Sequence, residues 1–114
     1  MNAIETTSAQ RKRIAELLVR GGMEPKLAGF GMLIDAAELY APHSLDKMTD
    51  IYAELGKRYG CSAKNVCAYI TYAISRADGL AAVFNEMFGT DYEPYRMENK
   101  LVVAMLSLYG KGLL

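Results

Sequence analysis

The sequence predicts an all-α protein: a compact bundle of about six helices that contains a helix-turn-helix and has no winged-helix hairpin. Three observations lead to this fold class. Apolar residues recur at three- and four-residue intervals along most of the 114 residues, and almost no segment alternates apolar with polar residues as a strand does. Several glycines and prolines mark where the periodic segments start and stop, as at the ends of helices. With 52% hydrophobic and 23% charged residues, the chain has the composition of one globular domain spanning residues 1–114.

The first predicted helix covers about Ser8 to Arg20, after a flexible lead at residues 1–7, and stops at a pair of glycines. Residues 11–13, with the sequence Arg-Lys-Arg, form its basic start. Positive charge is unfavourable at the amino end of a helix, because the helix dipole is positive there. A solvated face is therefore favoured for this cluster over a site that binds phosphate.

The second predicted helix has Pro25 in its first turn, where the missing amide costs nothing, and ends at Pro42. Its core positions recur at helical spacing: Leu27, Phe30, Ile34, Ala37 and Ala41. Two glycines inside the helix, Gly29 and Gly31, each cost roughly 1 kcal/mol relative to alanine. We expect them to permit a close crossing by another helix, an interpretation favoured over a flexible hinge.

The segment from Tyr52 to Tyr69 has the spacing of a helix-turn-helix, which we place at about residues 45–78. Gly56 is small enough for the second helix to cross closely, and Gly60 suits a left-handed turn because it has no Cβ. Ser62 is a good N-cap for the helix that follows. The apolar positions of the unit are Leu55, Tyr59, Cys61, Val66 and Tyr69. Plain helical hairpins share this spacing, so the pattern alone leaves open whether the unit reads DNA or only packs.

Two further helices are predicted beyond the helix-turn-helix. One covers Leu80 to Phe88, between two glycines, and the last covers about Met97 to Tyr109. In the last helix, the run from Leu101 to Leu106 is apolar nearly all round. Such a helix is either enclosed by its own domain or covered by a partner. Enclosure within the domain is favoured, and a homodimer through this C-terminal helix stays open.

The longest strongly apolar run, residues 101–106, is far shorter than the ~20 residues that a membrane span needs. Residues 1–8 also lack the basic-then-apolar pattern of a signal peptide. We therefore predict a cytoplasmic protein that does not associate with membranes. Cys61 and Cys67 form neither a CxxC redox motif nor a set of zinc ligands, so both are interpreted as small buried apolar groups.

Catalytic and metal-binding chemistry has little basis in the sequence. The only histidine, His43, precedes Ser44, the cap of the third predicted helix, in a connection without an obvious catalytic relay. It is interpreted as a surface turn residue. A solvated surface is favoured over a metal-binding stripe for the spaced carboxylates Asp46, Asp50, Glu54, Asp91 and Glu93. We predict no enzymatic activity, no metal site and no cofactor.

The formal net charge of the chain is zero, which is unusual for a protein that binds the phosphate groups of DNA. Residues 44–78 hold five basic and four acidic residues, a net charge of +1. The charge therefore argues mildly against DNA binding, and any positive face must be local.

Three stretches and one dipeptide carry a resemblance that covers nearly the whole chain. The stretches are ELLVRGGMEPKLAGFGMLIDAAELY, LGKRYGCSAKNVCAYITYAI and ENKLVVAMLSL, and the dipeptide is Phe88-Gly89. Together they resemble the C-terminal DNA-binding effector domain of the sporulation initiation response regulator, the stage-zero sporulation protein A family. The resemblance implies a helical domain that binds a short DNA box as a head-to-tail pair. It also implies contact with RNA polymerase sigma factor, through which promoters are activated or repressed.

In that family, a phosphorylated receiver domain precedes the effector domain. No βαβ pattern and no acidic phosphoacceptor pocket precede the first predicted helix here. We expect either an excised effector domain or a stand-alone effector. The initial Met1 with its short polar lead favours the stand-alone form.

The fourth helix, at about residues 63–77, is the predicted recognition helix. Advancing ~100° per residue from Val66 puts these residues on the inward side: Ile70, Ala73, Ile74 and Ala77. The residues predicted to face the bases are Lys64, Asn65, Ala68, Thr71 and Tyr72, with Ser75 on the same side. The residues predicted to contact the DNA backbone are Lys57, Arg58, Ser62 and Arg76. Asn65 suits an adenine edge, Thr71 or Ala68 a thymine methyl group, and Tyr72 a phosphate.

This outward face departs from the pattern of the family. Asn65, Ala68 and Thr71 stand where that pattern has arginines, and bidentate arginine to guanine is the commonest specific base contact. Two hypotheses follow. The preferred one is a sequence-specific DNA-binding transcription regulator with altered specificity. The alternative is a protein-interaction or dimerisation module that has lost base-specific DNA reading and uses the eight tyrosines and seven methionines of the chain.

Overall fold

The computed structural model describes residues 3–40 and 47–113 of the chain. Six α-helices and one 3₁₀-helix follow in chain order: α1 (Ala3–Arg20), α2 (Ala28–Leu39), α3 (Met48–Tyr59), α4 (Ala63–Ser75), α5 (Leu80–Phe88), η1 (Pro94–Arg96) and α6 (Asn99–Gly110). No β-strand occurs in either described range. The all-α fold class with about six helices is therefore confirmed.

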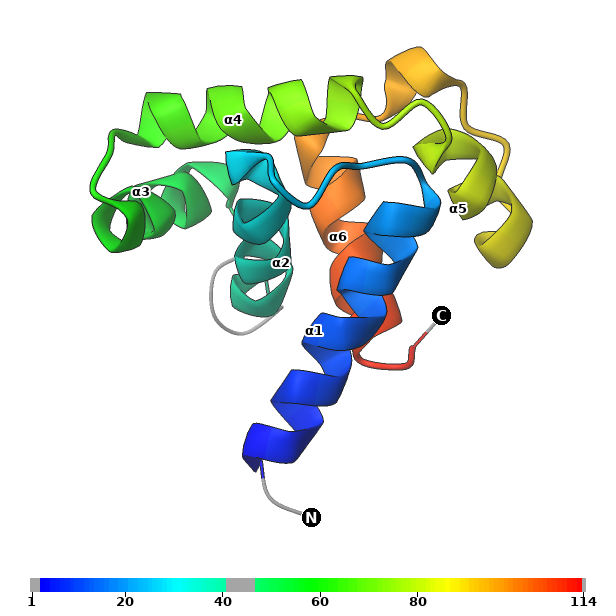
Figure 1. Ribbon diagram of the computed structural model, residues 1–114, viewed down its shortest axis with the longest axis horizontal. Coiled ribbons are helices and arrows are strands. Elements are labelled where there is room, and N and C mark those ends of the chain that lie inside the picture. Colours follow the sequence, from blue (N-terminus) through cyan, green and yellow to red (C-terminus); the bar gives the residue numbers. More distant parts are fainter. Residues whose placement is uncertain (1–2, 41–46, 114) are drawn as a thin grey trace.

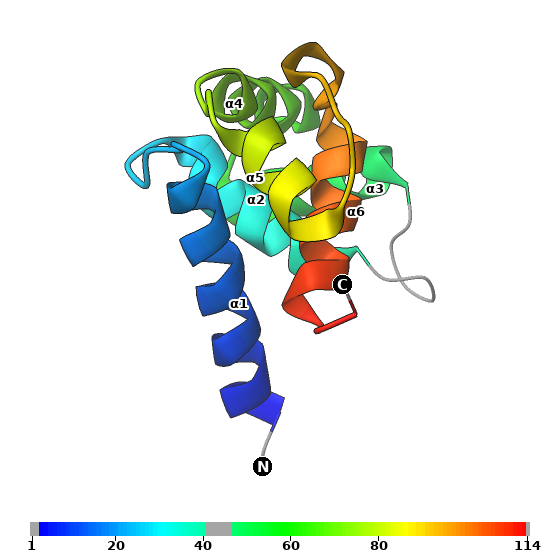
Figure 2. The same ribbon diagram turned by 90° about the vertical axis from the view of Figure 1, so that its right-hand side faces the viewer.

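The helix α4 lies across one end of the molecule (Figure 1). From there α1, α2 and α6 extend away from it, as the perpendicular view also shows (Figure 2). The radius of gyration, 13.2 Å, is close to the ~13 Å of a compact domain of about this length. In both views, the outer side of α4 is at the border of this compact domain, while its inner side faces the other helices.

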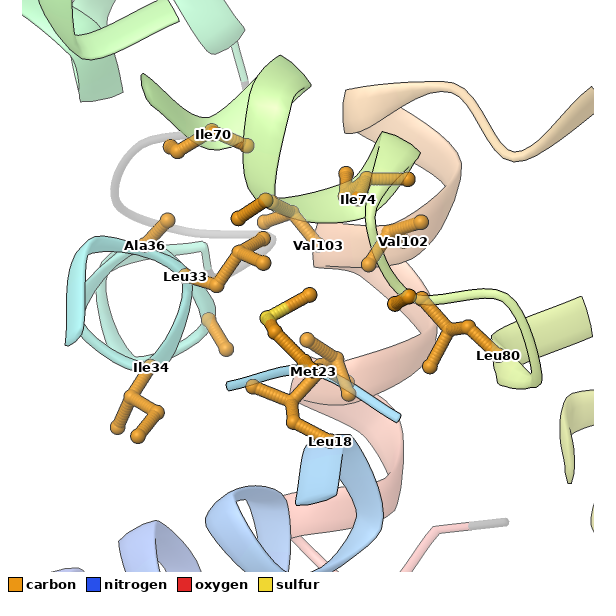
Figure 3. Packing of buried hydrophobic residues seen from close by; sticks show 14 of the residues in the cluster. Leu18, Met23, Leu33, Ile34, Ala36, Ile70, Ile74, Leu80, Val102 and Val103 are labelled. Carbon is orange, nitrogen blue, oxygen red and sulfur yellow. The ribbon is translucent and has the colours of Figure 1, made fainter. Parts of the chain in front are cut away.

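One apolar core joins α4 to the helices beneath it (Figure 3). Four helices each contribute a fully buried side chain to this core: Leu18 of α1, Leu33 of α2, Ile70 of α4 and Val102 of α6. Burying such a side chain completely stabilises a fold by roughly 1.5–3 kcal/mol relative to leaving it exposed. The position of α4 is therefore fixed by several helices that are distant in the sequence.

The first helix is longer than predicted. It begins at Ala3 rather than about Ser8, so residues Ala3 to Thr7 of the predicted lead are helical. No glycine or proline interrupts the chain between Ala3 and Arg20, and the helix stops where Gly22 takes φ +90°. Residues 11–13 therefore lie in the middle of α1 and not at its start.

The second helix is shorter than predicted. Pro25 lies in a turn before α2 and not in its first turn, because Leu27 still has an extended backbone and its amide bonds to the Glu24 carbonyl at 3.2 Å. The predicted close helix crossing is confirmed at Gly29, where a Cβ would lie 2.3 Å from the Tyr69 carbonyl oxygen of α4. A Cβ at Gly31 would meet only the Tyr59 hydroxyl, at 3.4 Å, so the chain is less crowded there than at Gly29.

The basic cluster of α1 is not simply a solvated face, so that interpretation is wrong in part. The guanidinium of Arg11 pairs with Asp35 at 2.8 Å and also with Glu38, both on α2. The guanidinium of Arg13 lies 4.9 Å from the ring centre of Tyr109 on α6. Arg11 and Arg13 therefore tie α1 to α2 and α6, whereas Lys12 between them is exposed.

Tyr59, predicted as an apolar position, instead joins this polar network. Its hydroxyl donates a hydrogen bond to the second carboxylate oxygen of Asp35 at 2.5 Å, and 44% of the residue is exposed. Burial, then the hydrogen bond to Asp35, raises the pKa of Tyr59 to about 12 from its ordinary value of 10.0.

The raised pKa of Tyr59 predicts a pH effect on stability. The neutral phenol is favoured in the fold, so its contribution is complete below pH 10.0 and is lost as the pH rises through about 12. Denaturant unfolding across this range should therefore show a steeper loss of free energy in the wild type than in Tyr59→Phe. The effect should be small, because solvent screens a partly exposed group. Tyr95→Phe, at a residue that is 78% exposed, is the control. Equal slopes for the wild type and Tyr59→Phe would contradict the prediction.

The last two α-helices follow the prediction closely. The bounds of α5 are as predicted, and Gly89 ends it with φ +67°. The helix α6 starts at Asn99, two residues after the predicted Met97, and runs one residue past Tyr109. Within its apolar run, Val102, Val103 and Leu106 are buried and the other three residues are partly buried, which agrees with enclosure by the domain.

Several predicted features fall outside the described residues: the end of the second helix at Ala41 and Pro42, the turn residue His43, the cap Ser44, Leu45, and the carboxylate Asp46. The third helix begins at Met48, where Lys47 serves as N-cap without a side-chain hydrogen bond. Among the described residues, no helix has the length and apolar character to cross a membrane.

Candidate nucleic-acid interface

The connection between α3 and α4 is built as the sequence predicts. Gly60 has φ +70°, and the amide of Cys61 bonds to the Gly56 carbonyl at 2.9 Å. A Cβ on Gly56 would lie 2.6 Å from the Cys61 carbonyl oxygen, so the turn closes directly over this glycine. The hydroxyl of Ser62 accepts a hydrogen bond from the Asn65 amide at 3.0 Å and caps α4. The roles predicted for these residues in the turn are confirmed.

The inward side of α4 is also as predicted: Val66, Ile70, Ala73 and Ile74 are all buried. The helix ends at Ser75, earlier than the predicted residue 77, and Ala77 is buried just beyond it. Two further details differ. Tyr69 is 45% exposed, because it lies at the edge of the inward arc. Cys61 and Cys67 are only partly buried, which corrects the interpretation of both as buried apolar groups.

The outward side of α4 brings all the predicted base-facing residues together. The exposed residues are Lys64, Asn65, Ala68, Thr71 and Tyr72, with Ser75 beside them. A rotation of ~100° per residue puts them on one side of α4. The helix itself lies at the border of the molecule (Figure 1). We call this surface the outward face of α4.

Some hydrogen-bonding groups on the outward face are already engaged within the protein. The hydroxyl of Thr71 donates to the Cys67 carbonyl at 2.8 Å and accepts from the Asn99 amide at 3.0 Å. The hydroxyl of Ser75 donates to the Tyr72 carbonyl at 2.6 Å. The side chains of Lys64, Asn65 and Tyr72 make no hydrogen bond to another described residue, so they are available to a ligand.

The four residues predicted to contact the DNA backbone lie at the ends of α3 and α4. Lys57 and Arg58 are in the last turn of α3, and Arg76 is the C-cap of α4. The Arg58 Nε lies 3.3 Å from Glu54, whereas Lys57 and Arg76 form no ion pair with a described residue. Ser62 is exposed, but its hydroxyl oxygen already caps the helix. Twelve residues separate Lys64 from Arg76, a distance of about 18 Å along a helix.

A shallow groove of about 400 Å³ lies between α3 and α4 beside the outward face. Its lining is Thr49, Tyr52, Ala63, Lys64, Cys67 and Ala68. Burial raises the pKa of Tyr52, an effect that the hydrogen bond from Asn99 partly offsets. The phenol therefore stays protonated at neutral pH.

Asn99 is the residue of this surface that sequence reasoning missed. Its amide group donates to the Tyr52 hydroxyl at 2.9 Å and to Thr71 at 3.0 Å, with the Cys67 carbonyl at 3.5 Å. Asn99 is the first residue of α6, and no local spacing relates it to α3 or α4. Only its polar character next to an apolar run distinguishes it in the sequence.

The predicted solvated carboxylates Asp91 and Glu93 are exposed, and they line a groove of about 620 Å³ near η1. Tyr92, Tyr95, Arg96, Glu98 and Leu101 complete its lining. Within the described ranges, no three histidine, cysteine or acidic residues gather as a metal ion requires.

Comparisons with models of protein families, with curated proteins and with solved structures found no match to this chain. The resemblance to the sporulation effector family therefore rests on the sequence stretches alone.

Proposed function

We propose that this protein is a sequence-specific DNA-binding transcription regulator, with α3 and α4 as its helix-turn-helix and α4 in the major groove. The observation that carries the proposal is the outward face of α4. All five predicted base-facing residues are exposed on one side of a helix whose other side is held in the core. A single helix with such a face fits the major groove, which is about 12 Å wide.

The chemistry of this face supports recognition of DNA through few contacts. Asn65 has a free amide, the side chain that pairs with an adenine edge through two hydrogen bonds. Lys64 and Arg76, about 18 Å apart along the helix axis, suit phosphates on either side of the groove. With Lys57 and Arg58 they would neutralise three or four phosphates, which gives a slope of log affinity against log salt of roughly −3 to −4.

Selection of duplexes from a random pool at low salt, followed by mobility-shift titration, tests the proposal. One short box should be enriched. Lys64→Ala should weaken binding to all duplexes and reduce the salt slope by about 1. Asn65→Ala should relax preference at one base pair, which corresponds to about 1–3 kcal/mol of discrimination. Lys12→Ala, at an exposed position in α1, is the control and should leave binding unchanged.

The absence of both enrichment and binding at low ionic strength contradicts this proposal. An equal loss of affinity on preferred and random duplexes in Asn65→Ala contradicts only the role of Asn65, because a residue that reads a base must affect specificity.

A protein-interaction module is the second candidate, favoured by the exposed tyrosines of α4. Tyr69 is 45% and Tyr72 55% exposed, and the groove between α3 and α4 lies on the same helix. Exposed tyrosines are enriched at protein interfaces. Purified RNA polymerase sigma factor, the partner that the family resemblance implies, is the first to test. Binding that survives charge changes at Lys64 and Arg76 and is lost in Tyr72→Ala favours this candidate. Sedimentation with and without DNA tests a homodimer through α6.

A further inference from the structure

The hydroxyl of Thr71 has little left to offer a ligand. A hydroxyl has one hydrogen, and that of Thr71 is donated to the Cys67 carbonyl one turn earlier in α4, at 2.8 Å. The same oxygen accepts a hydrogen bond from Asn99 at 3.0 Å. The residue is nevertheless exposed. What remains for an approaching partner is one acceptor lone pair and the methyl group of Thr71, with no hydrogen-bond donor.

Asn99 holds the Thr71 side chain in this arrangement. The two hydrogens of its amide are used by the two shortest contacts, to Thr71 at 3.0 Å and to Tyr52 at 2.9 Å. Threonine in a helix divides between two side-chain rotamers. A fixed donor on α6 favours the one that turns the oxygen toward α6. Asn99 thus links three helices and determines which group Thr71 presents.

The neighbours of Thr71 make the middle of the outward face apolar. Ala68 lies three residues earlier on the same side of the helix and is exposed, so it adds a second methyl group. The hydroxyl of Ser75 is turned back to the Tyr72 carbonyl at 2.6 Å. In the major groove, the apolar group that distinguishes one base from the others is the C5-methyl of thymine.

We infer that Thr71 reads thymine through contact between its own methyl group and the thymine C5-methyl, with Asn99 as the positioning residue that keeps the Thr71 hydroxyl turned away from DNA. This inference rests on the proposed DNA binding. It assigns the chemistry of one base pair in the box and gives α6 a part in reading it.

The test replaces each thymine of the selected box, one at a time, with deoxyuridine, which lacks only the methyl group. For the wild type, one position should lose affinity by about fourfold, the value of one buried methyl-sized group. Thr71→Ser keeps the hydroxyl and removes the methyl group, so it should bind the two duplexes equally. Thr71→Val keeps the methyl shape and removes the hydroxyl, so it should retain the preference for thymine.

The positioning role of Asn99 is measured by the same thymine-to-uracil ratio. Asn99→Ala should bring the ratio at that position toward one, while affinity for a random duplex stays unchanged. In a Thr71→Val background the same change should not alter the ratio, because valine has no hydroxyl to position. A melting curve for each variant verifies that it is folded.

The outcomes separate this inference from the proposed function. A wild type that binds its box but is indifferent to every uracil substitution overturns the inference and leaves DNA binding intact. Loss of the thymine preference in Thr71→Val but not in Thr71→Ser also overturns it, because the hydroxyl would then be the reading group. Absence of binding to any duplex overturns both.

Discussion

Gly29→Ala should destabilise the fold by about 3 kcal/mol, a large part of the 5–15 kcal/mol that stabilises a typical domain. The added Cβ would lie 2.3 Å from the Tyr69 carbonyl oxygen and 2.7 Å from the Ala73 Cβ. Both atoms belong to α4 and cannot rotate away, so α2 and α4 must separate along the core. The gain in helix propensity, about 1 kcal/mol, does not offset this.

Denaturant unfolding of Gly29→Ala beside Gly31→Ala measures the effect. Gly31 is in the same helix, and a Cβ there would meet only the Tyr59 hydroxyl at 3.4 Å. Gly31→Ala gains the same propensity without the clash, so it should be neutral or stabilising by up to about 1 kcal/mol. Similar stabilities for the two variants would contradict the close crossing of α2 and α4.

Gly56→Ala should have the second largest effect on stability and, under the proposed function, should also reduce DNA affinity. Its Cβ would lie 2.6 Å from the Cys61 carbonyl oxygen, a backbone atom of the turn between α3 and α4. Relief of this clash moves the turn and with it the start of α4, where Lys64 and Asn65 lie. We expect a loss of about 2–3 kcal/mol in stability. Binding to the selected box should fall by more than the unfolded fraction explains.

Gly60→Ala is the matched control for Gly56→Ala. Gly60 lies four residues later and has no atom within 4 Å of an added Cβ, but its φ is +70°. The cost is then only that of a left-handed alanine, about 1–2 kcal/mol, with the course of the chain preserved. Gly60→Ala should therefore keep its affinity for DNA once folded. A greater loss of affinity in Gly60→Ala than in Gly56→Ala would contradict the close contact at Gly56.

The features of the fold that the sequence predicts are those with a local physical cause. The inward arc of α4 follows from helical periodicity, and the roles of Gly60 and Ser62 follow from turn and capping preferences. A close crossing by another helix at Gly29 is inferred because a glycine inside a helix is costly unless something requires it. Each of these needs only the residues near it in the chain.

The features that were missed depend on contacts between distant residues. Arg11 finds its carboxylate partners on α2, 24 and 27 residues away, and Asn99 reaches Thr71 across 28 residues. Tyr59 has the amphipathic character to serve as an apolar or a polar position, and the place of Asp35 decides which. Helical periodicity predicts which residues lie on the outward face of α4. It does not predict which of their hydroxyls are already hydrogen-bonded within the protein, because that depends on distant residues such as Asn99.

The packing of α6 between the other helices has a consequence for synthesis on the ribosome. Gly110 lies against Ile14, where a Cβ would be 2.8 Å from the isoleucine Cδ1, and Ser107 bonds to the Tyr40 carbonyl at 2.8 Å. These are contacts of high sequence separation, and among the described helices α6 is translated last. A nascent chain that already contains α3 and α4 still lacks Val102, Val103 and the Asn99 hydrogen bonds. The packing that holds the outward face of α4 in place is therefore complete only after α6 has been translated.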